Sequence, residues 1–177
     1  MARHLMVDLE TLGTLPNTTV LTLGAVHFDP YSDWIGEDTL YLKFNMDDQD
    51  HLGRTIDQST IDWWGRQDPA IMEEAFSPDG RLPLDYCIDQ FHKFAWGCDA
   101  FWSHGSCFDL IILEDIYRQF NRAVPWQFYQ IRDTRTAFDL GIDPQMPKDS
   151  KHDALHDAVR QAIGVQNVYA GLGVKKR

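Results

Sequence analysis

The sequence predicts an α/β fold: a mixed five-stranded sheet, with three antiparallel strands followed by two parallel ones, flanked by helices. Three observations lead to it. Segments rich in β-branched and aromatic residues come first and are joined by short connections. Apolar residues at helical spacing then alternate with two further strand-like segments. A hydrophobic content of 44% supplies a core for one domain over residues 1–177, and no linker, repeat or low-complexity tract divides the chain.

Three strands are expected in the first part of the chain. They cover residues 4–10, 20–28 and 39–44, where apolar and β-branched residues dominate. Turn-forming residues, among them Gly13 and Pro30, lie between the strands. Because the connections are short, neighbouring strands are expected to pair antiparallel.

The rest of the chain is expected to alternate helices with two more strands. Ser59 is suited to cap a helix over residues 60–67. Asp68 and Pro69 are suited to open another, so residues 54–81 are expected to form a helical insertion on the sheet. Periodicity predicts further helices over 84–96, 108–120, 134–140 and 154–172, and strands over 100–103 and 128–132.

Composition excludes several classes of function. A protein with a formal net charge of −11 is unsuited to bind a long duplex through its phosphates. A nucleic-acid enzyme of this charge is therefore expected to hold only a few nucleotides at a strand end. No apolar run is long enough to span a membrane and no secretory signal is evident, which predicts a cytoplasmic protein without a membrane partner. The three cysteines show no paired spacing, so neither disulfides nor a thiolate zinc site is expected.

Two carboxylates interrupt the end of the first strand. Asp8 and Glu10 are two positions apart, so an extended chain points both to the same face. Like charges that close raise each other's pKa unless a cation lies between them, and a hard divalent cation is the usual remedy. The alternative is that either residue only ends a strand or caps a turn.

A third carboxylate, Asp109, stands where a strand passes into an apolar helix. Ligand-binding groups of α/β sheets gather at such strand ends. Aspartate is equally typical of helix starts, so this segment alone leaves a capping role open.

The segment His152-Asp-Ala-Leu-His-Asp157 offers a further cluster. Residues five apart on one helix do not share a face, so His152 must lie in the loop before the helix if it is to reach the pocket that Asp157 faces. Asp153 is then the helix cap. The competing hypothesis pairs His152 with His156 as a zinc site, but neither a Glu in a His-Glu-x-x-His pattern nor a nearby thiolate supports it. Taken alone, His156 is expected to be a surface or packing residue.

The chain resembles the DEDDh group of 3′→5′ exonucleases, in the ribonuclease H-like superfamily, on three motifs in order: Asp8-x-Glu10, Phe108-Asp109 and His152-x-x-x-x-Asp157. Residues 59–64, 102–109, 132–136 and 152–157 make it similar to the phage exonuclease A (DexA-like) branch and its bacterial exoribonuclease relatives. The resemblance covers almost the whole chain. It has one departure, because Gly105 stands where many members have an Asn, which removes a contact around the site but none of the ligands.

The resemblance implies a ribonuclease H-like fold and hydrolysis of phosphodiester bonds with two Mg²⁺ or Mn²⁺ ions about 4 Å apart at the scissile phosphate. Carried over residue by residue, it implies that Asp8 bridges the ions and that the full set of metal ligands is Asp8, Glu10, Asp109 and Asp157. It implies that His152 is the general base on the attacking water, because imidazole titrates near neutral pH.

Substrate contacts are expected from four more residues. In the family, the Thr after the first motif contacts the terminal 3′ hydroxyl and the next residue wedges against the last base, which assigns these roles to Thr11 and Leu12. Phe108 is a candidate for stacking on a base, since aromatic faces accept any nucleobase. The adjacent Trp63 and Trp64 point about 100° apart on a helix, so one is expected to pack inward, and Trp64 is expected to line the cleft.

Three hypotheses on function remain open from the sequence. The first is a 3′→5′ exonuclease acting on the 3′ ends of single-stranded DNA or RNA. The second is a catalytically inactive nucleic-acid-binding or accessory module, which predicts a replaced site residue, whereas all five are present. The third is a hydrolase of very short oligonucleotides or nucleotide derivatives. Dimers are frequent in the superfamily, so a homodimer is a further partner to consider, with Trp96, Phe101 and Trp126 as candidates for its surface.

Overall fold

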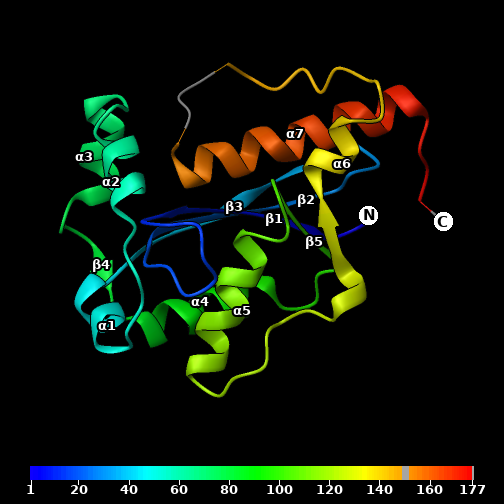
Figure 1. Ribbon diagram of the computed structural model, residues 1–177. Coiled ribbons are helices and arrows are strands. Elements are labelled where there is room, and N and C mark those ends of the chain that lie inside the picture. Colours follow the sequence, from blue (N-terminus) through cyan, green and yellow to red (C-terminus); the bar gives the residue numbers. More distant parts are fainter. Residues whose placement is uncertain (149–151, 177) are drawn as a thin grey trace.

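The computed structural model describes residues 1–148 and 152–176 and has a six-stranded sheet at its centre (Figure 1). The strands are β1 (His4–Thr11), β2 (Val20–Phe28), β3 (Ile35–Phe44), β4 (Arg81–Leu82), β5 (Ala100–Ser103) and β6 (Ile131–Asp133). β1, β2 and β3 pair antiparallel, β5 and β6 continue the sheet in parallel from β1, and β4 pairs parallel to β3 at the other edge. The spatial order is therefore β4-β3-β2-β1-β5-β6.

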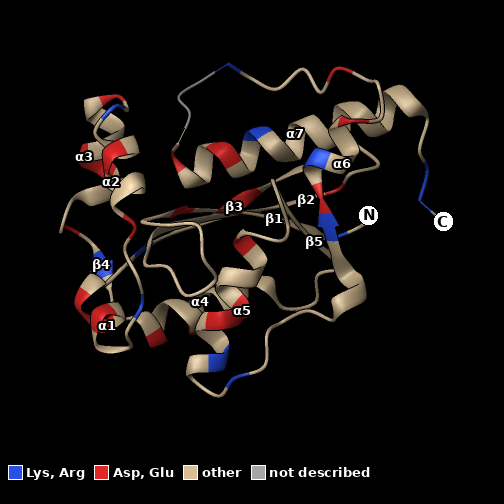
Figure 2. Cartoon of the chain, in the orientation of Figure 1, with Lys and Arg blue, Asp and Glu red and all other residues tan. Residues whose placement is uncertain are grey.

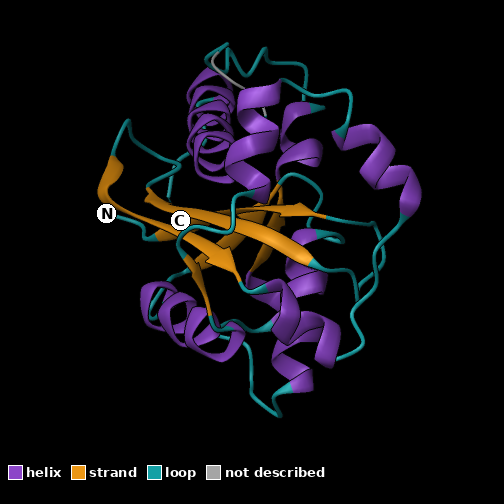
Figure 3. Cartoon of the chain, turned by 90° about the vertical axis from the view of Figure 1, so that its left-hand side faces the viewer, coloured by secondary structure: helices purple, strands orange, loops and turns teal. Residues whose placement is uncertain are grey.

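Helices cover both faces of the sheet (Figure 3). They are α1 (Met46–His51), α2 (Gln58–Trp64), α3 (Pro69–Phe76), α4 (Leu84–Ala95), α5 (Asp109–Gln119), α6 (Thr134–Phe138) and α7 (Ala154–Leu172), with a 3₁₀ turn over Phe128–Gln130. α7 packs across β1 and β2 on one face, α4 and α5 lie on the other, and α2 and α3 stand to one side (Figure 1). No helix in the described residues is long and apolar enough to cross a membrane.

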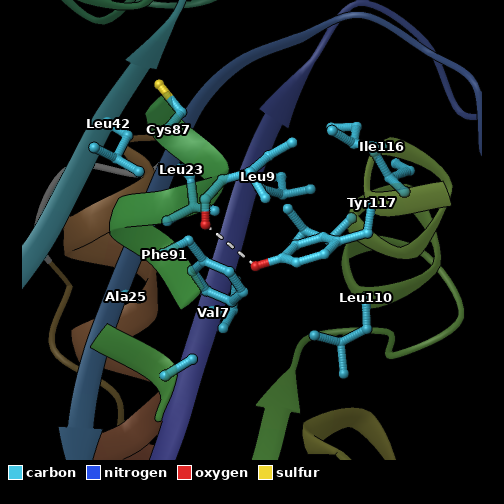
Figure 4. Close-up of a cluster of buried hydrophobic side chains, with 14 of the residues drawn as sticks. Val7, Leu9, Leu23, Ala25, Leu42, Cys87, Phe91, Leu110, Ile116 and Tyr117 are labelled. Atoms are coloured by element: carbon cyan, nitrogen blue, oxygen red, sulfur yellow. Dashed lines mark hydrogen bonds between the residues drawn. The ribbon is translucent and has the colours of Figure 1, made fainter. Parts of the chain in front are cut away.

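The alternation of side chains along β1 decides what each face of the strand contacts. Val7 and Leu9 are buried in the largest hydrophobic cluster, with residues of α4 and α5 (Figure 4). Met6 lies on the opposite face in a second cluster, with alanines and a valine of α7. Asp8 and Glu10 follow Met6 on that face, so the strand carries both carboxylates to the start of α7.

Most expected elements are present, with shifts at their ends. Asp57 rather than Ser59 caps α2, because the Asp57 carboxylate accepts hydrogen bonds of 2.8 Å from both the amide and the hydroxyl of Ser59. Residues 128–132 form a 3₁₀ turn followed by β6 instead of one strand. The sheet has six strands instead of five, since β4 is too short to carry a strand pattern of its own. The sequence pattern did not predict α1, which the structure has and which Asn45 caps.

Two of the three residues considered for a dimer surface are buried. Phe101 and Trp126 are 0% and 4% exposed and pack in the largest cluster. Trp96, just after α4, is 70% exposed. The reason is that Phe101 lies on the short strand β5, with a neighbouring strand on each side, and Trp126 packs against its ring.

Gly24 on β2 fixes how closely α7 approaches the sheet. A Cβ added at Gly24 would lie between 2.2 and 2.3 Å from backbone atoms of Ala154 and Leu155, the first two residues of α7. No side-chain rotation relieves a contact with backbone, so the start of the helix would have to move. Gly24 therefore sets the position of the segment that carries His152 and Asp157.

We expect Gly24→Ala to destabilise the protein. Overpacking costs roughly 1–3 kcal/mol, and each kcal/mol lowers Tm by about 2–4 °C for a chain of this size. Thermal unfolding followed by circular dichroism measures the effect. Gly65→Ala is the control, because a Cβ at Gly65 meets its nearest atoms at 3.7 Å. Equal Tm values for the two variants would show that the close approach at Gly24 is not a constraint.

Candidate active site

One pocket brings together all five residues that the sequence singles out for catalysis. It has a volume of about 380 Å³ and lies where β1 ends, beside the starts of α5 and α7. Its wall contains Asp8, Glu10, Asp109, His152 and Asp157, together with His104, Phe108, Arg135, Met146, Arg160 and Gln161. Segments from the two ends and the middle of the sequence therefore converge on one place.

Hydrogen bonds from the surrounding framework hold two of the carboxylates. Oδ1 of Asp8 accepts a hydrogen bond of 2.8 Å from Nε2 of Gln161 on α7. Oδ1 of Asp109 accepts one of 3.0 Å from the backbone N–H of Leu9, which ties α5 to β1. Asp109 is the first residue of α5 and not its cap, since Phe108 occupies the cap position. The capping alternative for Asp109 therefore does not hold.

Asp157 connects the loop residue His152 to α7. His152 has a left-handed φ of 66°, and its backbone N–H donates to Oδ2 of Asp157 at 2.7 Å. Oδ1 of Asp157 pairs with Nη1 of Arg160, whose Nε donates to the carbonyl of Pro147 at 2.6 Å. Asp153 caps the helix as the sequence predicts. His152 therefore precedes the helix and lies over the same pocket as Asp157.

The site carboxylates carry more negative charge than the protein compensates. Burial, followed by repulsion from Asp109 and Glu10, raises the pKa of Asp8 well above its usual value. Burial raises the pKa of Glu10 to about 8, and repulsion from Asp157 adds to the shift. Burial also raises the pKa of Asp109 to about 7, although hydrogen bonds to its carboxylate oppose the shift. In the described residues, Arg160 is the one cation in an ion pair with a site carboxylate.

The donor set fits a hard divalent cation. Ligand atoms of Glu10, His152 and Asp157 lie within 4.8 Å of one another, and Asp8 and Asp109 line the same pocket outside this group. Carboxylate oxygens are the ligands that Mg²⁺ and Mn²⁺ prefer. A cation there would neutralise the repulsion that raises the pKa values. Oε1 of Gln161 is buried and has no hydrogen-bond partner among the described residues, so it is available to a water on such a cation. His156 is outside this group and its side chain is 62% exposed, which does not support a zinc site built on the two histidines.

The two adjacent tryptophans of α2 have the opposite of the expected positions. Trp64 is 1% exposed in a third hydrophobic cluster, and its indole N–H donates to the carbonyl of Thr11 at 2.9 Å. Trp63 instead meets the His152 ring edge to face, with ring centroids 4.7 Å apart. Trp64 therefore packs in the core rather than lining the cleft, and the helical offset of about 100° turns Trp63 towards the catalytic pocket.

The other three residues expected to contact substrate differ in their access to the pocket. Phe108 is half-buried and lines it. Leu12 and Thr11 are 1% and 7% exposed and do not line it, and the Thr11 hydroxyl donates to the carbonyl of Gly13 at 2.8 Å. A wedge at Leu12 or a 3′-hydroxyl contact from Thr11 would therefore need the connection between β1 and β2 to shift.

The wall of the pocket contains six residues that are not among the sequence candidates: Leu9, His104, Arg135, Met146, Arg160 and Gln161. Arg160 and Gln161 lie one turn after Asp157 on α7, so helical spacing from Asp157 is a signal that points to them. Arg135 lies within residues 132–136, one of the segments that resemble the family, whereas Met146 carries no signal of its own. They reach the pocket from α6 and from the loop that follows it, and only tertiary packing brings that loop to α7.

We expect the metal-free protein to lose stability as the pH rises. Folding raises the pKa of Glu10 from an ordinary value of 4.5 to about 8, and that of Asp109 from 3.8 to about 7. At a pH between the ordinary and the raised value, the folded state keeps a proton on the carboxyl that the unfolded chain releases. The free energy of unfolding then falls with rising pH, by about 1.4 kcal/mol per pH unit for each such carboxyl, until the folded-state pKa is passed. Thermal unfolding in EDTA between about pH 5.5 and about pH 8.5 measures the loss. Mg²⁺ or Mn²⁺ should raise Tm more at the higher pH.

Glu10→Gln removes one of these titrating groups and should flatten the pH dependence of Tm in EDTA. Glu73→Gln is the matched control, because this carboxylate is exposed on α3. The same dependence on pH in the wild type and in Glu10→Gln would contradict the account of the carboxylates.

Comparisons with known sequences point to one group of enzymes. Residues 3–169 match the family model described as 3′-5′ exoribonuclease Rv2179c-like domain. The exodeoxyribonuclease of Enterobacteria phage T4 is 25% identical over 196 aligned positions, which cover 89% of this chain and 85% of the phage protein.

Comparisons with solved structures confirm the ribonuclease H-like fold that the motifs imply. Cell-death related nuclease 4 (CRN-4) superposes with a TM-score of 0.66 and 20% identity, over 98% of this chain and 65% of that one, so this chain spans slightly less than two thirds of its length. The nuclease domain of 3′hExo, a DEDDh family member bound to rAMP, superposes with a TM-score of 0.58 and 17% identity, over 99% and 94% of the two chains.

Proposed function

This chain belongs to the family of 3′-5′ exoribonuclease Rv2179c-like domains and is a 3′-5′ exonuclease of the DEDDh type, and from this premise we propose its substrate and mechanism. It hydrolyses phosphodiester bonds at the 3′ ends of single-stranded RNA or DNA. His152 is the general base, and divalent cations are held by Asp8, Glu10, Asp109 and Asp157.

The convergence of four carboxylates and one imidazole in a single pocket carries this proposal. Burial and mutual repulsion raise the pKa values of Asp8 and Glu10, and burial raises that of Asp109, so keeping these groups together costs folding free energy. An inactive accessory module would have no use for buried carboxylates that repel one another. A pocket of about 380 Å³ also suits one nucleotide-sized group better than a duplex.

The chain's own groups position the ligands. When bound, Mg²⁺ or Mn²⁺ supplies a Lewis acid that activates water and stabilises the leaving 3′ oxygen. Gln161 fixes the carboxylate of Asp8, and the amide of Leu9 fixes that of Asp109. Each carboxylate keeps further lone pairs for a cation after accepting these hydrogen bonds.

His152 accepts the proton of the attacking water in this proposal. Trp63 packs against its ring, and Asp157 accepts a hydrogen bond from its backbone N–H. The carboxylate of Asp157 therefore holds the base in a fixed relation to the other ligands. Phe108 lines the same pocket and is placed to stack on a base of the strand.

A ladder assay tests the proposal. Single-stranded DNA and RNA of one sequence, each labelled at the 5′ end, are incubated with Mg²⁺, Mn²⁺ or EDTA. We expect progressive shortening from the 3′ end that needs metal, and the relative rates on the two strands identify the preferred sugar. Uncut strands under both metals would favour the accessory module, and products from internal cleavage would contradict the proposed direction.

A further inference from the structure

A second polar pocket lies at the opposite end of β1 from the catalytic carboxylates. It has a volume of about 350 Å³ and forms where the N-terminal segment, β6 and the residues after α7 meet. Figure 2 shows Lys and Arg on β6 and on the C-terminal segment, on the side of the molecule where both termini lie. We call this the distal pocket; its wall includes His4, Tyr31, Arg132, Tyr169, Lys175 and Lys176.

The distal pocket is cationic in a chain whose formal net charge is −11. Arg132, Lys175 and Lys176 line it, and within the described ranges none of them is in an ion pair. Asp99 is the one carboxylate in the described wall, and one of its oxygens already accepts the backbone N–H of Arg3 at 3.0 Å. Arg132 and Lys176 donate hydrogen bonds to backbone carbonyls and keep their charge, and Asp29 acts on the ring of His4 in addition to Asp99. Three cations against two carboxylates leave a net positive site, which attracts anions.

His4 adds a neutral donor to the wall of the distal pocket. It is 7% exposed, and burial lowers its pKa to about 4, so the ring is neutral near pH 7. Nδ1 of His4 accepts the indole N–H of Trp102 at 3.0 Å, which places the ring proton on Nε2. No group in the part of the chain that the structure describes accepts a hydrogen bond from this Nε2, so the donor is available to a ligand.

Two tyrosines make the distal pocket aromatic as well as cationic. The rings of Tyr31 and Tyr169 are half-buried, with centroids 5.7 Å apart. Proteins that bind single strands without sequence preference combine cations for the phosphates with aromatic faces for the bases. A small inorganic anion would use only the cations, so this wall suits a nucleotide unit of a strand.

An edge strand joins the distal pocket to the catalytic pocket. Arg132 on β6 lines the distal pocket, and Arg135 at the start of α6 lines the catalytic one. Both are exposed, and their Cα atoms are at most about 11 Å apart because the two residues are three positions apart in the chain. Arg160 also lines the catalytic pocket, where it pairs with Asp157. A strand with its 3′ end at the carboxylates can therefore pass its upstream phosphates along this edge.

The pocket on the other side of His152 is unfavourable for phosphates. A neighbouring pocket of about 270 Å³ shares His152 with the catalytic one. Its wall carries Asp68, Glu74 and Asp153, with no Lys or Arg among its described residues. Lys43 pairs with Glu74 from outside the wall, so Asp68 and Asp153 are the carboxylates without a cationic partner among the described residues, apart from the contact of Asp153 with His156. Like charges repel a phosphodiester backbone there, so the charge distribution directs the upstream strand towards β6.

We infer that the distal pocket binds the same single strand several nucleotides upstream of the cleaved 3′ end, through backbone phosphates and one base. The inference rests on the proposed function and narrows its substrate class. His4 and Asp8 are four residues apart on β1, which corresponds to about 13 Å. Strands long enough to cover this distance are therefore preferred over very short oligonucleotides, a class of substrate that the sequence alone leaves open.

The double variant Lys175→Gln, Lys176→Gln tests the inference. Both residues are exposed after the end of α7, so their loss leaves the packing of the sheet intact. The measured quantity is kcat/KM on a single strand of about twelve nucleotides relative to that on a dinucleotide, which is too short to reach the distal pocket. We expect the ratio to fall roughly tenfold and the dependence of KM on salt to become shallower, by about 0.7 in the logarithmic slope for each lost phosphate contact. Lys93→Gln, an exposed cation on α4, is the control.

Fluorescence anisotropy with the labelled strand in EDTA separates the inference from the proposed function. If the wild type cleaves neither substrate, the proposed function fails, and anisotropy still tests whether the distal pocket binds the strand. Weaker binding of the strand by the double variant supports the inference, and equal binding overturns it. An unchanged substrate ratio in an active enzyme also overturns it. Competition by inorganic polyphosphate as effective as that by the strand would contradict the role of the tyrosines.

Discussion

Asp8→Asn is expected to lower kcat on a single strand by at least about 10³-fold, since several kcal/mol of charge stabilisation depend on the metal ligands. Asp8 is the central group of the site, because repulsion from Asp109, Glu10 and Asp157 all acts to raise its pKa, in addition to the larger effect of burial. Single-turnover cleavage of a 5′-labelled strand at saturating Mg²⁺ measures the loss.

The stability of the same variant distinguishes a lost ligand from a damaged fold. An Asn oxygen still accepts the hydrogen bond that Gln161 donates to Oδ1 of Asp8, and the substitution removes one of several buried like charges. We therefore expect Tm in EDTA at about pH 8 to be unchanged or higher, and the increase in Tm on adding Mg²⁺ to disappear. Glu73→Gln should match the wild type in both tests. A variant that keeps the wild-type kcat would contradict the assignment of Asp8.

His152→Asn is expected to lower kcat by about 10²–10⁴-fold, the usual contribution of a positioned general base. Asn is the suitable replacement because it tolerates the left-handed backbone conformation that His152 adopts, with φ of 66°. The variant should keep its response of Tm to Mg²⁺, since the four carboxylates remain. The pH dependence of kcat should lose the component that titration of an imidazole contributes near neutral pH.

The control for this variant is His156→Asn, four residues later in the same segment and exposed. It should have wild-type activity. Ligand atoms of His152 lie within 4.8 Å of those of Glu10 and Asp157, so the imidazole is also placed to bind a cation. Loss of the Tm response to Mg²⁺ in His152→Asn would assign it as a ligand and contradict its role as the base.

Local patterns predicted the parts of the site that depend on one element. Alternation along β1 puts Asp8 and Glu10 on one face, and the structure has them on the face that α7 covers. Helical geometry requires His152 to precede a helix capped by Asp153, and the structure has this arrangement. These predictions succeed because strand and helix periods fix side-chain direction without reference to the rest of the chain.

Features that depend on contact between distant elements were not predictable in the same way. The offset between Trp63 and Trp64 follows from helix geometry, but which of them enters the core depends on how α2 packs against β1 and β2. Arg135 reaches the catalytic pocket because β6 pairs with β5, and Arg132 reaches the distal pocket for the same reason. No periodicity or spacing in a single sequence predicts that two such distant strands pair.

Anomalous diffraction from crystals grown with Mn²⁺ tests whether the site carboxylates form a metal centre. We expect Mn²⁺ within about 2.0 to 2.6 Å of carboxylate oxygens of the four proposed ligands, Asp8, Glu10, Asp109 and Asp157, the range in which hard divalent ions are coordinated. Crystals of Asp8→Asn should lose this density. Anomalous density only elsewhere on the protein, or none at saturating Mn²⁺, would contradict the claim that these carboxylates form a metal centre.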